Sequence, residues 1–346
     1  MADSTSFASA VNTAKMNAIL WAVDPTQDPK EAKNLVKELK AWAKHLDCEV
    51  LPVAIYSKAM ANLPLKMPYP WDEEFEERAR KSLARYLKKT NTSGFLSPEV
   101  LFVPWVSTRK MAFALAKYAQ ATKAKMIFVN TRARKSWNPF RLGGFAETLV
   151  TTSRTPVLLL NPAAEPSGKI RTILFPTDFS VHSRRALEIL KPWVKTVGAK
   201  LLIFNQIETP TVYQAEFASG LPVVDAESLI EEIEQTRMTQ LCEWQQSLQE
   251  GGLKSGALIQ RQRKYLAAEV LEAAKKNKAS LIALASESGP FAQAILGSTA
   301  RDVLLKASCP VLVFFRPKVV RKHGTIHREL KTTKSLMPVV TEPQPH

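Results

Sequence analysis

Two aspartates stand where a side chain could bind a ligand or simply hold a turn. Asp24 follows the apolar run AILWAV, and Asp178 follows IRTILF. An aspartate just after a strand caps the next turn or helix more often than it binds a ligand, and Ser180 is placed to assist Asp178 in that role. Asp24 precedes a proline, which is itself a turn signal. Capping is therefore the first expectation for both.

A cationic segment, RARKSWNPF, gathers Arg132, Arg134 and Lys135 next to Trp137. Such a cluster attracts anions, and an aromatic ring among cations could stack on a base or dock on a partner. The ring could equally cover the edge of a sheet. We favour packing for Trp137.

Catalytic and metal-binding motifs are missing from the sequence. There is no GxSxG, no GxxxxGK[ST], and no cysteine with a histidine partner that would mark a nucleophile. His323 and His327 have helical spacing, but they lie near the C-terminus, where a solvated pair is more usual than a zinc site. The sequence predicts neither a catalytic residue nor a metal site, and so a protein that is not an enzyme.

Composition indicates a folded protein of more than one domain. The chain has 346 residues, of which 45% are hydrophobic and 23% charged. No apolar run reaches the length of a membrane-spanning helix, and the first residues lack the pattern of a secretory signal. The cysteines, Cys48, Cys242 and Cys309, form no CxxC pair, so we expect buried thiols in a reducing compartment. The cytoplasm is the expected location.

The net charge of +16 is unevenly distributed. Residues 1–163 hold 24 Lys and Arg against 14 Asp and Glu, residues 164–318 hold 19 against 16, and residues 319–346 hold 5 against 2. A positive field attracts nucleic acid, anionic lipid or acidic proteins. Cations that merely solvate helix faces explain the charge equally well.

The apolar runs predict a strand-and-helix alternation that occurs twice. In residues 1–163 we expect strands at 18–23, 49–55, 99–103, 125–129 and 156–160. A first helix should carry Leu35, Leu39, Trp42 and Leu46 on one face, and further helices are expected at 71–89 (exposed), 107–123 and 142–152. In residues 164–318 we expect strands at 170–175, 200–205, 258–260, 280–284 and 310–314, with helices at 180–197, 226–250, 266–276 and after Gly297. Continuous apolar strands between helices predict a parallel, doubly wound α/β sheet.

This repetition predicts two tandem Rossmann-like domains of five parallel strands each, 1–163 and 164–318, followed by a basic flexible tail, 319–346. The closing segments TSRTPVLLLNP and KASCPVLVFFRP match best. Each ends in an apolar strand that would leave an open edge, so we expect these two strands to pair within one chain. The tail has few large apolar residues, and removing residues after Lys318 should leave the melting temperature nearly unchanged.

Two segments carry a resemblance to a known family. ILFPTDFSVHSRRALEIL, from Ile173 to Leu190, and AILGSTARDVLLKASCPVLVF, from Ala294 to Phe314, resemble the opening and closing parts of a universal stress protein domain of the UspA type. MNAILWAVDP and FRLGGFAETLVTTSRTPVLLL resemble them more faintly. The resemblance implies a five-stranded parallel sheet that pairs with a second domain through its last strand. In some members it also implies ATP at the carboxyl ends of the strands.

The family's phosphate motif, G-x-x-G, nine residues, then G-S/T, is incomplete in both halves. In the second, Gly297 and Ser298 fit the final pair, whose amides at a helix start attract anions. The glycines that allow close approach are replaced by Leu284 and Glu287, and Gly289 would need a rearranged loop. The charge of Glu287 beside a triphosphate should oppose binding by about 1–4 kcal/mol.

In the first half, Gly143 and Gly144 match the final pair, while Asn130 and Ala133 replace the earlier glycines. Arg132 and Arg134 would hold phosphate by charge. The resemblance also implies nucleoside contacts for Asp24 and Asp178. We therefore expect ATP to bind the second half weakly or not at all, and the first half weakly and with salt sensitivity, so that no cofactor is needed.

Three functions remain open. One is a non-enzymatic stress or signalling protein that acts through contact with a protein partner. The second is a nucleotide sensor occupied by ATP or AMP. The third is an accessory factor on an anionic surface such as RNA, the ribosome, DNA or a membrane, without being integral to it. Association of two chains into a homo-oligomer stays open in each case. The resemblance and the incomplete motifs favour the first.

Overall fold

The computed structural model describes residues 17–57, 73–104, 107–131, 143–161, 168–207, 226–285 and 296–314. We call residues 17–161 the first half and residues 168–314 the second half. The first half runs β1 (Ala18–Val23), α1 (Pro29–His45), β2 (Glu49–Ser57), α2 (Glu73–Lys89), β3 (Glu99–Val103), α3 (Thr108–Ala121), β4 (Met126–Asn130), α4 (Gly144–Thr152) and β5 (Val157–Leu160).

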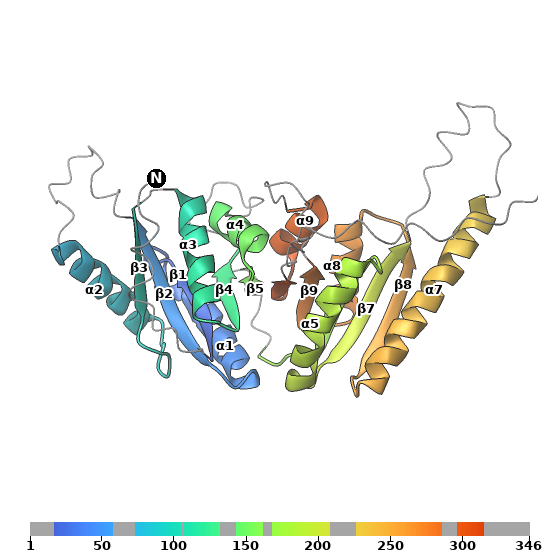
Figure 1. Ribbon diagram of the computed structural model, residues 1–346, viewed down its shortest axis with the longest axis horizontal. Coiled ribbons are helices and arrows are strands. Elements are labelled where there is room, and N and C mark those ends of the chain that lie inside the picture. The colour runs from blue at the N-terminus through green and yellow to red at the C-terminus, as the bar shows by residue number, and fades with distance from the viewer. Residues whose placement is uncertain are drawn as a thin grey trace, which may run out of the picture. The chain divides into compact units, whose positions relative to one another are not determined.

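The second half repeats this order (Figure 1). It runs β6 (Thr172–Pro176), α5 (Val181–Val197), β7 (Lys200–Ile207), α7 (Ala226–Glu250), β8 (Ser255–Arg261), α8 (Leu266–Lys276), β9 (Leu281–Ala285), α9 (Ser298–Lys306) and β10 (Val311–Phe314). The predicted strands and helices are confirmed, with ends that move by at most a few residues. The predicted α/β class with a parallel sheet in each half is also confirmed.

Each half contributes five parallel strands to one sheet of order β3-β2-β1-β4-β5-β10-β9-β6-β7-β8. The two groups meet where β5 and β10 pair antiparallel, with Leu158 opposite Leu312. The predicted pairing of the two closing strands is therefore confirmed. It removes two open strand edges, which would otherwise be available to other chains.

Helices cover both faces of the sheet because alternate strand residues point to opposite sides. One apolar core joins the sheet to α1, α2, α5 and α7, through residues such as Leu39, Leu83, Leu190 and Leu241. The other joins it to α3, α4, α8 and α9. Fully burying one such side chain contributes about 1.5–3 kcal/mol, so these apolar runs dominate the stability of the fold.

Two expectations about exposure were wrong. Helix α2 is not exposed all round, because Ala79, Leu83, Tyr86 and Leu87 are buried. These four residues lie on one face of α2. The helix also contains eleven charged or polar residues, and these obscure the helical spacing of the apolar residues in the sequence. The thiols are not all buried either: Cys309 is, Cys48 is partly covered, and Cys242 is exposed on α7.

The basic tail, 319–346, lies outside the described residues, and so do Trp137, Arg132 and Arg134. The expectations for these residues stay predictions. The described helices include none that is both long and apolar enough to cross a membrane.

Candidate functional site in the second half

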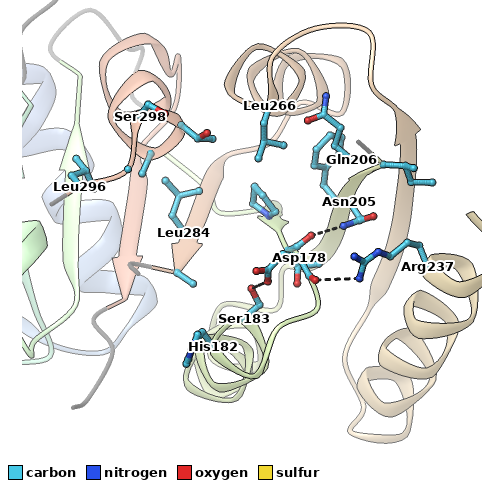
Figure 2. A pocket seen from close by; sticks show the side chains of 18 of the residues that line it. Asp178, His182, Ser183, Asn205, Gln206, Arg237, Leu266, Leu284, Leu296 and Ser298 are labelled. Carbon is cyan, nitrogen blue, oxygen red and sulfur yellow. Dashed lines mark hydrogen bonds between the residues drawn. The ribbon is translucent and has the colours of Figure 1, made fainter. Parts of the chain in front are cut away.

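A cavity of about 920 Å³ opens at the carboxyl ends of the central strands of the second half (Figure 2). It lies where β6 has β7 on one side and β9 on the other. The chain leaves β6 into α5 on one face of the sheet and leaves β9 into α9 on the other face. A crevice forms at such a switch point, and open α/β sheets bind their ligands there.

The turn after β6 places Asp178 in the wall of this cavity. Its Oδ1 accepts hydrogen bonds from the Ser180 amide at 2.9 Å and the Ser183 hydroxyl at 2.6 Å. Ser180 caps α5 by accepting a hydrogen bond from the Ser183 amide. Partial burial acts to raise the pKa of Asp178, but the hydrogen bonds from Ser183 and Ser180 outweigh it, and the pKa lies below the usual 3.8. The carboxylate is therefore ionised at neutral pH, and the expected capping is present.

Phe179 packs the turn after β6 against helix α7. Its backbone has φ of +61°, which is uncommon for a bulky side chain. The ring packs edge-on against Trp244 with centroids 5.2 Å apart, and the guanidinium of Arg237 lies 5.8 Å from the ring centroid. Arg237 Nη1 also donates to the Asp178 carbonyl oxygen at 3.3 Å. A change in the conformation of this turn therefore alters the contacts that hold α7.

Asn205, at the carboxyl end of β7, adds a buried amide to the same wall. Its side chain is 4% exposed, and Nδ2 donates to the Thr177 carbonyl oxygen at 2.7 Å. That contact fixes which atom of the amide is the donor. Oδ1 is buried and accepts no hydrogen bond from any residue that the structure describes. Figure 2 places Asn205, Asp178 and Arg237 together, across the cavity from Ser298.

The opposite wall is the start of α9. Gly297 is the N-cap residue of this helix and makes no side-chain capping hydrogen bond, so the first amides of α9 are left for another acceptor. A Cβ added at Gly297 would meet nothing within 4 Å. Leu284 and Leu296 line the apolar part of this wall. Amides at a helix N-terminus attract anions, so this end of the cavity suits a phosphate or carboxylate.

The corresponding residues of the first half lie at the ends of the adjacent strands β1 and β4. Asp24 Oδ1 accepts hydrogen bonds from the amide and the hydroxyl of Thr26, at 3.0 and 2.6 Å. Gly143 is the N-cap residue of α4, and its amide donates to the Thr131 carbonyl oxygen at 3.1 Å. Gly144 begins α4. The capping role expected for Asp24 is present here as well.

Sequence reasoning proposed three ligand-contacting residues that line the cavity, but it did not single out two polar residues of the same wall. Asp178, Gly297 and Ser298 line one cavity, as the resemblance implied. Asn205 was not singled out, although a polar residue at the end of the apolar run LLIFN was the available signal. Arg237 was missed because it reaches the cavity only through the packing of α7. Glu287 and Gly289 lie outside the described residues.

In the described part of the chain, no group of three or more His, Cys, Asp or Glu side chains could hold a metal ion. His323 and His327 lie outside that part. The cavity therefore offers hydrogen-bonding groups, an ionised carboxylate and a helix N-terminus to a ligand.

These features define an α/β protein with a crevice at the carboxyl ends of its strands, and comparison with known proteins gives its family. The model of the universal stress protein family matches the chain twice, at residues 16–161 and 169–314. The chain therefore belongs to the universal stress protein family, as two tandem copies of its domain. Among curated proteins, none matches this chain.

Solved structures agree with this fold. A universal stress protein from Archaeoglobus fulgidus is similar with a TM-score of 0.59 and 19% identity, covering 89% of this chain and 99% of its own. A functionally unknown protein from Pseudomonas aeruginosa PAO1 is similar with a TM-score of 0.57 and 16% identity, covering 88% of this chain and 94% of its own. At these identities the likeness extends to the fold alone.

Proposed function

We propose that this chain is a non-enzymatic stress-response protein of the cytosol, which acts through contacts with a protein partner under the control of a nucleoside phosphate held weakly in the second half. The observation that carries this proposal is that one cavity joins Asp178 to the N-terminus of α9. The anion-binding end of the cavity matches a phosphate, and the hydrogen-bond-accepting end matches a donor on a ribose or base. The apolar wall between them matches the body of a nucleoside.

The cavity favours weak binding. The leucine at position 284 lines it where the family's phosphate motif has a glycine, so backbone amides lose the close approach that a glycine permits. Phosphate is left with the first amides of α9 and the more distant Arg237. We therefore expect affinity in the high micromolar range or weaker, corresponding to about 4–6 kcal/mol.

The chemistry of the wall supports a binding role over a catalytic one. Because the pKa of Asp178 is held below 3.8, this carboxylate is a poor general acid at neutral pH and a weak general base. The Ser183 hydroxyl donates to Asp178 directly, so no imidazole stands between them to activate it as a nucleophile.

Ligand control over a partner follows from the contacts of Arg237. This side chain borders the cavity and also holds α7 against the turn through the Asp178 carbonyl oxygen and the Phe179 ring. A ligand that engages Asp178 or Arg237 changes the contacts that fix α7. Such a change is a route from the cavity to the molecular surface, because much of α7 is exposed.

The test begins with the full chain as purified. A ligand held this weakly dissociates during purification, so denaturation should release little nucleotide; the stripped protein should then bind AMP, ADP or ATP at millimolar concentration, with slower hydrogen exchange in α7. A stripped protein whose stability and α7 exchange do not respond to AMP, ADP or ATP at millimolar concentration would contradict the proposal. Rapid turnover of ATP by the wild type, lost in Asp178→Ala, would contradict the non-enzymatic part.

A further inference from the structure

The two halves meet at the antiparallel pair of β5 and β10 and the adjacent helices α4 and α9, which we call the seam. The seam has the geometry of a two-fold axis, but different residues lie on its two sides. Helices α4 and α9 begin at Gly144 and Ser298, and strands β5 and β10 begin at Val157 and Val311, an interval of 154 residues in both cases. Leu158 lies opposite Leu312 in the antiparallel pair, at the same interval. Leu158 therefore meets its own counterpart, while Val157 and Leu159 each lie opposite the counterpart of the other, as residues around the axis of a symmetric dimer do.

Position 147 and its counterpart, position 301, carry opposite charges. Glu147 on α4 forms an ion pair with Arg301 on α9, in which Arg301 Nη2 donates to Glu147 Oε1. Both side chains are partly exposed. Two identical domains joined by this seam would instead set like charge against like charge: Glu147 against a second Glu147, or Arg301 against a second Arg301. Like charges directly opposite one another repel.

A second contact at the seam also depends on the two halves being different. Asn161, just after β5, donates from Nδ2 to the Leu305 carbonyl oxygen at 2.9 Å, and this contact is buried. Leu305 is in the last turn of α9, where carbonyl groups have no partner within the helix. The counterpart of Asn161 in the sequence is Phe315, which has no side-chain donor. Two second halves joined in this way would leave the Leu305 carbonyl without that donor.

We propose that the ion pair between Glu147 and Arg301, together with the Asn161 contact, specifies the partner of each closing strand. The surface formed by α4 and β5 fits a domain with a cation at the position of residue 301 and rejects a second copy of itself. The surface formed by α9 and β10 fits a domain that presents an anion and an amide donor. Its partner is the first half of this chain, and a like half of another chain is excluded.

Charge reversal in the full chain tests this assignment. Glu147→Arg and Arg301→Glu each place like charges at the axis, while the double variant restores opposite charges in the reverse order. Hydrogen exchange in residues 157–160 and 311–314 reports opening of the seam, and exchange in β1 serves as an internal reference. Each single reversal should speed exchange in both closing strands about three- to tenfold, and the double variant should return it near the wild-type rate.

Two matched variants separate the seam from general destabilisation. Glu77→Lys breaks the ion pair between Lys81 and Glu77 on α2 and should leave exchange in both closing strands unchanged. Asn277→Asp removes the same kind of amide contact, from Asn277 Nδ2 to the Ala273 carbonyl oxygen at 2.9 Å, within the second half alone. Asn161→Asp should speed exchange in β10 more than Asn277→Asp does.

The assignment is overturned if the single reversals leave exchange in the closing strands unchanged. It is also overturned if the double reversal exchanges as fast as the single variants, because charge order would then not matter.

Discussion

The two halves share one strand order but differ at the crevice that each forms. The difference is clearest in the pairing of β1 with β2 and of β6 with β7. In the first half Ala22 lies opposite Val53, and in the second Pro176 lies opposite Phe204. One residue further along each second strand, the first half has the buried Ala54 where the second has Asn205. Both side chains are buried, so the second half places a polar amide where the first half continues its apolar core.

The halves also begin corresponding helices by different means. Helix α3 has a conventional N-cap, in which Ser107 Oγ accepts from the Lys110 amide at 3.4 Å. Helix α8 has no side-chain cap at Tyr265. Instead the carboxylate of Glu269, 1% exposed, accepts from the amides of Arg263 and Lys264 and from Gln260 Nε2.

The largest expected effect comes from breaking that second arrangement. Glu269→Ala leaves two amides and a side-chain amide without their acceptor, so we expect a loss of about 2–4 kcal/mol in the free energy of unfolding. Ser107→Ala should cost about 1 kcal/mol or less. Urea denaturation of both variants measures the difference. Equal losses would show that Glu269 is no more important than an ordinary cap.

Blocking the α9 end of the cavity should affect binding and leave the fold intact. Gly297 and Gly144 both have open space where a Cβ would lie. Gly297→Leu should therefore keep the wild-type melting temperature and weaken nucleotide binding about tenfold or more, because its side chain enters the anion end of the cavity. Gly144→Leu, at the first residue of α4 and one position after the counterpart of Gly297, is the control for a side chain added at a helix start in the first half. A loss of binding in Gly144→Leu equal to that in Gly297→Leu would contradict the placement of the site.

A smaller effect is expected from the pKa of Asp178. Since this pKa is lower in the folded state than the usual 3.8, ionised Asp178 stabilises the fold above that pH, and the contribution disappears as pH falls through the folded-state pKa. The stability of the wild type relative to Asp178→Asn should be constant near neutral pH and shrink below about pH 4. Thermal unfolding at pH 7, 5 and 3 measures it. A gap that is the same at pH 3 and pH 7 would contradict the hydrogen-bonded carboxylate.

The smallest effect is expected from any site in the first half, which relies on the charge of Arg132 and Arg134. Binding there should be weaker than in the second half and should fall steeply with salt, because exposed charges are screened within about 10 Å at 0.1 M salt. Titration of the double variant Asp178→Ala with Gly297→Leu at low and high salt isolates this residual binding. Residual binding that does not change with salt would argue against a purely electrostatic site.

The sequence was sufficient for the fold because most strands are short apolar runs between helix-period segments, with β8 (SGALIQR) the least apolar. The sequence predicted the helix α2 but not its buried face, because charged residues obscure the apolar stripe of Leu83 and its neighbours. It also predicted the three cavity residues that lie on a family pattern, namely Asp178, Gly297 and Ser298. Arg237 could not be predicted, because its contact with the Asp178 carbonyl spans 59 positions and depends on how α7 packs.

Calorimetric titration of the nucleotide-free full chain with AMP and ATP tests the central claim most directly. The account predicts one dominant weak site, abolished in the double variant Asp178→Ala with Gly297→Leu, which keeps only the weaker first-half binding, and retained in the first-half variant Asp24→Ala with Gly144→Leu. Two equal sites, or a single site that survives the second-half substitutions and is lost with those in the first half, would contradict it.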